Sequence, residues 1–234
     1  MITKIIVKPN TFAEQVLFFK EIDLKKLKNH KMVLLFGPNG VGKSTLLRDI
    51  LKAAGGRNSG LILEHDGTPA IAYSYANSKD NFKVREARSY NESFDPNFIK
   101  ARYDASHISE GQSVLYSVYD LLDALKPGKG NFQEPGKHTI VFLDEIDSGL
   151  SIDNIDMAMK KLKYALRTRD DLQIFMSFNS PRVLKHFSEV VSMYDGTILT
   201  MKTDDDMLAE IKKHQKEFRK TRQYANGRPK VTFA

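Results

Sequence analysis

The chain alternates between short apolar runs, which predict buried strands, and longer segments whose apolar residues recur at helical spacing. The predicted strands cover residues 2–9, 15–19, 31–37, 138–145 and 172–178. The predicted helices cover residues 43–55, 109–125, 154–169 and 204–222. Two further segments predict β-hairpins, residues 188–201 and residues 61–75 with Asp66 and Gly67 at the turn. Strands that alternate with helices favour an α/β fold with a mainly parallel sheet.

One domain, residues 1–234, accommodates all of these elements. Residues 1–75 and 138–203 form the expected core, which combines the parallel sheet with an antiparallel β lobe. Residues 76–137 form the expected small helical lobe, and residues 204–234 form a basic helix and tail.

The composition is that of an ordinary folded protein, with 41% hydrophobic and 28% charged residues. No apolar run reaches the length of about 18 residues that a membrane-spanning helix needs. The first nine residues lack the basic-then-apolar pattern of a signal peptide. Cysteine is absent, which excludes disulfides and thiolate metal sites. We therefore expect a soluble, cytoplasmic protein without a membrane span.

The net charge of +7 is concentrated at the end of the chain, because residues 211–234 hold eight Lys or Arg and one Glu. A basic tail of this kind is typical of contact with nucleic acid or an acidic partner, and equally of a solvated helix end. Residues 76–106 also mix aromatic and basic side chains, as proteins that bind single-stranded nucleic acid do. Acidic residues are nearly as common there, so a small lobe with its own core is the favoured interpretation.

Residues 37–45, "GPNGVGKST", fit the phosphate-loop pattern G-x-x-x-x-G-K-[ST], and they follow a predicted strand and open a predicted helix. The glycines let backbone amides turn toward phosphate oxygens, and the helix N-terminus favours an anion. Lys43 is expected to reach the terminal phosphates, and the Ser44 hydroxyl to bind Mg²⁺. The predicted phosphate-binding residues are Gly37, Pro38, Asn39, Gly40, Val41, Gly42, Lys43, Ser44 and Thr45.

The apolar segment "TIVFLDE" ends in two acids, Asp144 and Glu145. We expect this strand to lie beside the strand that precedes the phosphate loop. Asp144 would then bind Mg²⁺, and Glu145 would orient the water that attacks a γ-phosphate. The acidic strand end is a weak signal by itself and becomes strong together with the phosphate loop.

The phosphate loop, "SEGQ" before a predicted helix and "FLDE" occur in an order that resembles the ATP-binding cassette (ABC) ATPases. "DEIDSGLS", residues 144–151, resembles the family's Walker B motif and D-loop, and "VVSMYDGTIL" resembles its late hairpin. The resemblance covers about residues 15–200. It implies an α/β P-loop fold of ABC type that binds ATP and Mg²⁺.

The resemblance also implies an ATP-dependent homodimer, because in this family the signature loop of one subunit closes over ATP on the phosphate loop of the other. By resemblance, Ser109 and Gly111 would contact the partner's γ-phosphate. Ser109 and Gln112 also have the spacing of a capping box, which leaves a helix N-terminus facing the anion.

Two departures from the family pattern concern hydrolysis. No glutamine occurs between Ser44 and Ser109, and Asn77 or Asn81 is the candidate for that role. In "SFNSP", Asn179 stands where the family has its switch histidine, and asparagine can bond a γ-phosphate but cannot transfer a proton. We therefore predict slow, partner-dependent turnover, with Lys43, Glu145 and Asn179 as the catalytic residues and Glu145 as the chief of them.

Lys43 and Ser109 are 66 residues apart, which excludes the long coiled-coil insertion of SMC-type proteins. "DEIDSGLS" followed by "NSP" is more similar to soluble RecF-like and OLD-like ATPases than to transporter cassettes. Three functions stay open. The first is an ATPase that drives or gates a separate effector, in DNA repair or phage–host conflict. The second is the nucleotide-binding subunit of an ABC transporter. The third is an ATP-gated clamp with little hydrolysis.

Overall fold

The structure, a computed structural model, describes residues 1–76, 85–87, 119, 121–127, 135–201, 203, 205–210 and 212–213. The strands are β1 (Ile2–Val7), β2 (Glu21–Asp23), β3 (Met32–Phe36), β4 (Leu61–His65), β5 (Ala70–Ala76), β6 (Arg85–Ala87), β7 (His138–Asp144), β8 (Leu172–Ser177), β9 (Glu189–Ser192) and β10 (Ile198–Thr200). The α-helices are α1 (Phe12–Val16), α2 (Lys43–Ala54) and α5 (Ile152–Thr168), and two 3₁₀-helices are η1 (Leu24–Lys26) and η3 (Pro181–His186).

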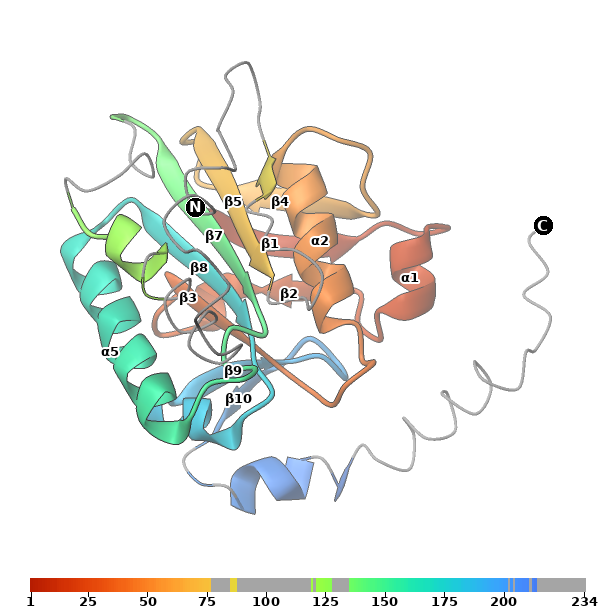
Figure 1. Cartoon of the computed structure of the whole chain (residues 1–234). Coiled ribbons are helices and arrows are strands. Elements are labelled where there is room, and N and C mark those ends of the chain that lie inside the picture. The colour runs from red at the N-terminus through yellow and green to blue at the C-terminus, as the bar shows by residue number, and fades with distance from the viewer. Residues whose placement is uncertain are drawn as a thin grey trace, which may run out of the picture.

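The strands form two sheets (Figure 1). The larger sheet has the order β10-β9-β3-β8-β7-β5-β6, and its pairs from β9 to β5 are parallel. Its two edge pairs, β9–β10 and β5–β6, are antiparallel. The smaller sheet, β2-β1-β4, is antiparallel throughout. The expected α/β fold with a mainly parallel core and an antiparallel lobe is confirmed.

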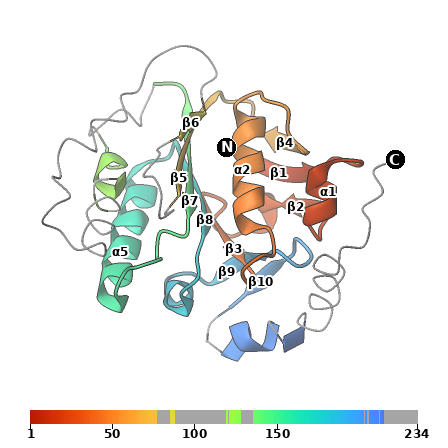
Figure 2. The same cartoon turned by 45° about the vertical axis from the view of Figure 1, so that its right-hand side comes forward.

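The two sheets and the helices lie in layers (Figure 2). Helix α5 covers one face of the larger sheet, and α2 lies on its other face, between the two sheets. The central strands are covered on both faces, which explains why β3 and β8 are buried along their whole length. The rings of Phe142 on β7 and Phe175 on β8 stack with their centroids 5.4 Å apart.

The prediction of a strand at residues 15–19 is wrong, because α1 occupies the start of this segment and ends at Val16. The Thr11 hydroxyl accepts a hydrogen bond from the Glu14 amide (3.4 Å), and the Glu14 carboxylate accepts one from the Asn10 amide (2.6 Å). This reciprocal cap fixes the first turn of a helix, and it outweighs the β preference of the apolar residues that follow.

The prediction of a hairpin at residues 61–75 is also wrong, whereas the hairpin at 188–201 is confirmed as β9–β10. Strand β4 pairs with β1 in the smaller sheet, and β5 pairs with β7 in the larger one. The turn at Asp66 therefore connects two sheets. The Asp66 carboxylate binds both the Met1 ammonium (2.7 Å) and the His138 ring (2.9 Å), so it joins the beginnings of β1 and β7.

The strand that ends in Asp144 does not lie beside the phosphate-loop strand, and that prediction is corrected. Strand β8 pairs in parallel with both β3 and β7 and separates them. All six residues of β8 are buried, so the strand belongs in the centre of the sheet, where a neighbour on each side bonds its backbone.

Two buried polar side chains tie β8 to its surroundings. Gln173 donates to the carbonyls of Ile2 and His30 (both 2.9 Å) and accepts from the Ile2 amide (2.8 Å), which joins the two sheets. Arg169, at the end of α5, donates to the Asp171 carboxylate, the Thr139 hydroxyl (2.7 Å) and the carbonyl of Leu125 (3.3 Å). The Arg169 guanidinium therefore fastens α5 to the starts of β7 and β8.

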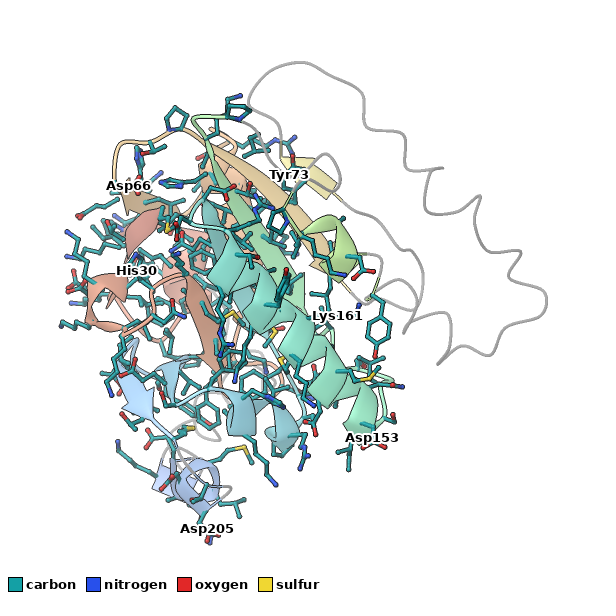
Figure 3. The ribbon with its side chains drawn as sticks, turned by 90° about the vertical axis from the view of Figure 1, so that its left-hand side faces the viewer. His30, Asp66, Tyr73, Asp153, Lys161 and Asp205 are labelled. Carbon is teal, nitrogen blue, oxygen red and sulfur yellow. The ribbon has the colours of Figure 1, made fainter. Side chains whose placement is uncertain are left out.

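Only parts of two predicted helices fall within the described residues. Residues 121–124 of the segment 109–125 are helical, and Lys161 on α5 holds them through Asp123 (2.8 Å; Figure 3 labels Lys161). Residues 205–210 and 212–213 of the segment 204–222 are helical as well. Residue 119 is helical too, residue 125 lies in the turn that follows, and the remaining residues of both segments lie outside the described residues. In the part of the chain that the structure describes, no helix has the length and hydrophobicity needed to cross a bilayer.

Replacing Asp66 with asparagine should lower the free energy of unfolding by up to about 1 kcal/mol at neutral pH, because the carboxylate is partly exposed. Burial raises the pKa of Asp66, but the bonds from the Met1 ammonium and the Thr68 amide outweigh it and lower the pKa to about 2. A carboxyl with a depressed pKa stabilises the fold above its unfolded-state pKa, near 4, and loses that contribution as the pH falls toward 2.

Urea unfolding of wild type and Asp66→Asn at a series of pH values checks this prediction. The difference between the two proteins should be constant above about pH 4 and should shrink between about pH 4 and pH 2. A difference that persists unchanged at the acid end would contradict the assignment of this stabilisation to the ionised Asp66.

Candidate active site

The phosphate loop connects β3 to α2 at the carboxyl end of the parallel strands. Gly42 precedes the first residue of α2 and has φ = 99°, a conformation in the left-handed region that favours glycine. A Cβ atom on Gly42 would also lie 3.2 Å from the Leu17 side chain. Since the N-cap residue has no side chain to bond the first amides of α2, these amides can serve an anion.

Lys43 extends from the first turn of α2 back over the loop, and it is 4% exposed. Its ammonium donates to the carbonyls of Gly37 (2.8 Å) and Pro38 (3.3 Å). Burial lowers the pKa of Lys43, and the charges of Glu145, Asp144 and Asp147 oppose that shift. The lysine therefore lies within electrostatic reach of three carboxylates, all from the end of β7 and the turn after it.

Three oxygen atoms link the ends of the strands to the phosphate loop. The Ser44 hydroxyl donates to Asp144 Oδ1 (3.0 Å), although the two residues are 100 positions apart. The Ser177 hydroxyl at the end of β8 donates to the same oxygen (2.5 Å). Because β8 lies between β3 and β7, Ser177 is well placed to hold Asp144 toward the loop. Sequence reasoning missed this role of Ser177, whose signal is a lone hydroxyl at the end of an apolar strand.

Glu145 follows β7 and has an unusual backbone conformation for a residue with a side chain. Its φ is 54°, in the left-handed region, and its amide donates to the Ser177 hydroxyl (2.9 Å). A non-glycine residue in this region is strained by about 1–3 kcal/mol and persists where its surroundings fix it. Ser177 therefore supports both acids, by bonding the side chain of Asp144 and the backbone of Glu145.

Asp147, in the turn after β7, contacts Asn179, which follows β8. The Asp147 carboxylate accepts hydrogen bonds from the amides of Asn179 (2.9 Å) and Ser180 (2.5 Å). The Asn179 side chain is exposed, and it has no hydrogen-bond partner among the residues that the structure describes. The sequence identified Asn179 as a candidate site residue but gave Asp147 no role. The hydrogen bond between the Asn179 amide and Asp147 joins residues 32 positions apart and leaves no local signal.

The family model for the ATPase family associated with various cellular activities (AAA) matches residues 33–182. This range begins in β3, contains the phosphate loop and both acids, and ends just beyond Asn179. The chain belongs to the AAA family. The family match and the geometry thus agree that this is a P-loop ATPase domain.

The AAA domain also has the fold of ABC cassettes. It is similar to MJ1267, an ATP-binding cassette of an ABC transporter, with a TM-score of 0.51 at 13% identity, over 92% of this chain and 97% of that one. It is similar as well to cbiO1 from Clostridium perfringens, part of the ABC transporter complex cbiONQ, with a TM-score of 0.45 at 13% identity, over 92% and 96%. At this identity the likeness to MJ1267 shows the fold alone. No curated protein matches the sequence.

The AAA domain brings most predicted site residues together at one end of the sheet. The Ser44 hydroxyl bonds Asp144, Ser177 bonds both Asp144 and the Glu145 amide, and Lys43 lies within electrostatic reach of both acids. The predicted contacts of Ser109, Gly111 and Gln112 lie outside the described residues, as do Asn77 and Asn81.

The Ser44 hydroxyl and the Asp144 carboxylate suit a magnesium ion, which prefers oxygen ligands. Within the described residues, no group of three or more His, Cys, Asp or Glu side chains could hold a metal ion. Mg²⁺ often uses only one or two protein ligands and completes its shell with water and phosphate oxygens. The donor set of this AAA domain therefore fits Mg²⁺ carried together with a nucleotide.

Proposed function

We propose that this chain binds Mg-ATP, dimerises around two ATP molecules and hydrolyses them slowly to drive or gate a separate effector protein. The observation that best supports the proposal is the bonded group of Ser44, Asp144 and Ser177 beside Lys43 and Glu145. These residues come from the start of α2 and the ends of β7 and β8, and their convergence at a phosphate loop is the arrangement that phosphoryl transfer needs.

Each described residue has a distinct task in the proposed hydrolysis. The amides at the start of α2 and the Lys43 ammonium bind the phosphates, the ammonium exchanging its carbonyl partners for phosphate oxygens. Ser44 and Asp144 would hold Mg²⁺, which when bound neutralises charge on the β- and γ-phosphates. Glu145 orients and polarises the attacking water. Ser177 holds the Asp144 side chain and the Glu145 backbone in position.

The dimer and the slow rate rest on the sequence. Ser109, Gly111 and Gln112 resemble the signature loop that closes over a partner's ATP. Asn179 in the switch position can bond a γ-phosphate without transferring a proton, which favours slow turnover. Placement among RecF-like or OLD-like ATPases, a cytoplasmic location and nucleic-acid binding through residues 211–234 are further parts of the proposal. A transporter subunit, which would co-fractionate with membranes, and an ATP-gated clamp are the alternatives.

Replacing Lys43 with alanine tests the proposed activity. We expect wild type to release phosphate from ATP slowly, and Lys43→Ala to lose about 100-fold, since one preorganised donor to a phosphoryl group contributes about that much. The exposed Arg48 on the same helix gives a matched control, and Arg48→Ala should keep the wild-type rate. Equal rates for wild type and Lys43→Ala, or no phosphate release from wild type, would reject the proposed hydrolysis.

The composite site is tested by mixing two inactive variants. Lys43→Ala lacks the phosphate-loop lysine, and Ser109→Arg blocks the proposed signature contact. In a mixed dimer one of the two sites has both parts intact, so mixing should restore part of the lost activity. Size measurement with and without ATP should show a shift from monomer to dimer. Two variants that stay inactive when mixed, and a chain that stays monomeric in ATP, would exclude the dimer.

A further inference from the structure

The Asp147 side chain lies in the turn after β7 and is 5% exposed. Its Oδ2 accepts hydrogen bonds from the backbone amides of Asn179 (2.9 Å) and Ser180 (2.5 Å). The Ser180 hydroxyl in turn accepts a hydrogen bond from the backbone amide of Arg182 in the first turn of η3 (3.3 Å). One carboxylate oxygen therefore fixes the backbone of the segment that carries Asn179.

The far side of the same segment has a separate anchor. Asp156 on α5 binds the Arg182 guanidinium through two nitrogens and the His186 ring at 2.7 Å. These bonds hold the side chains of η3 against α5. Asp147 instead holds the two backbone amides that precede η3, next to the end of β8. The two aspartates thus restrain neighbouring but different parts of the chain, which makes Asp156 a matched comparison.

The second oxygen of Asp147, Oδ1, is buried and has no hydrogen-bond partner among the residues that the structure describes. A buried carboxylate oxygen without a partner lowers the stability of a fold. Residues that are held at such a cost are concentrated at functional sites. Asp147 is in such a site, because its charge acts on the phosphate-loop lysine, Lys43.

We propose that Asp147 is a positioning residue for ATP hydrolysis and that it acts through Asn179. Oδ2 fixes the peptide groups at Asn179 and Ser180, so that the exposed side chain of Asn179 is presented to the γ-phosphate in one orientation. The inference rests on the proposed function, because it takes Asn179 as a ligand of that phosphate. A fixed orientation matters because a displacement of about 1 Å at a reacting group can lower a rate by about 100-fold.

Three variants test the inference: Asp147→Ala, Asp147→Asn and Asn179→Ala. Asp147→Ala should lower kcat about tenfold or more, since the freed segment no longer holds Asn179 in place. Asp147→Asn keeps an oxygen that accepts both amides and should keep most of kcat. In the Asn179→Ala background, Asp147→Ala should lower kcat no further.

Asp156→Ala is the control for a purely structural effect. It should lower the thermal midpoint while kcat, measured where every variant is folded, stays within about twofold of wild type. The inference is overturned if Asp147→Ala keeps the wild-type kcat, if its effect multiplies with that of Asn179→Ala, or if Asp156→Ala lowers kcat equally.

Amide hydrogen exchange at residues 179 and 180 gives a measurement that does not depend on hydrolysis. Exchange should become faster in Asp147→Ala and remain slow in Asp147→Asn. Unchanged exchange in Asp147→Ala would overturn the inference even if the proposed function holds. Absent ATP hydrolysis in wild type, with the exchange pattern as expected, would instead reject the proposed function and leave the role of Asp147 in holding the segment.

Discussion

Replacing Glu145 with glutamine should lower kcat for ATP hydrolysis by about 100-fold or more while ATP still binds. A carboxylate accepts a proton from water and aligns it, whereas an amide of the same shape cannot become protonated at neutral pH. The substitution leaves the backbone bond from the Glu145 amide to the Ser177 hydroxyl in place. Phosphate release measured at saturating ATP gives kcat, and nucleotide binding is measured separately by calorimetry.

The same variant should accumulate as an ATP-bound dimer, because the closed state forms and no longer decays by hydrolysis. Light scattering with ATP measures that dimer. Glu64 on β4 is exposed and far along the chain from the site, so Glu64→Gln is the matched control and should behave as wild type. An ATPase rate that is the same in Glu145→Gln as in wild type would contradict the assignment of Glu145 as the water-orienting group.

Replacing Arg169 with methionine should lower the free energy of unfolding by about 3 kcal/mol. Arg169 is 2% exposed, and its guanidinium binds Asp171, Thr139 and the carbonyl of Leu125. Removing one partner of a buried ion pair costs about 3–5 kcal/mol, because the other charge stays buried without compensation. We expect the lower end of that range, since the Asp171 side chain is 21% exposed and keeps some contact with water.

Thermal unfolding checks this expectation, with a fall in midpoint of about 6–12 °C for a domain of this size. Arg167 is exposed in the last turn of the same helix, and Arg167→Met should change the stability by no more than about 0.5 kcal/mol. The double variant Arg169→Met with Asp171→Leu should recover part of the loss, because it removes the stranded charge. Equal stabilities of Arg169→Met and Arg167→Met would contradict the role of Arg169 as a buried fastening point.

The parts of the site that could be predicted from the sequence are those whose signal is local. The phosphate loop is a run of nine residues between a strand and a helix, and its spacing is fixed by how a backbone wraps a phosphate. Asp144 and Glu145 follow directly from an apolar strand. For these residues, neighbours in the sequence are enough to identify the residues of the site, although not the order of the strands that carry them.

The parts that could not be predicted depend on contacts between distant segments. Ser177 supports Asp144 from 33 positions away, and this contact exists only because β8 separates β3 from β7. The order of strands in a sheet leaves no mark in the local pattern of apolar residues. The hairpin assigned to residues 61–75 failed for the same reason, since β4 pairs with β1 from the start of the chain. The helix α1 is different, because its cap at Thr11 and Glu14 is a local signal, and it prevails over the apolar run that predicts a strand.

The position of β8 also sets the sequence of events during synthesis. The phosphate loop leaves the ribosome first, Asp144 follows 100 residues after Ser44, and β8 emerges later still. Until β8 is made, β3 has no central neighbour on that side, and the backbone hydrogen-bonding groups along that edge stay unpaired. Parallel sheets whose paired strands lie far apart in the sequence fold slowly, and their apolar strands stay exposed until the partner strand has been made. The nucleotide site is therefore completed only when the strand between its two halves is inserted, and a nascent chain that stops before β8 carries both motifs without a site.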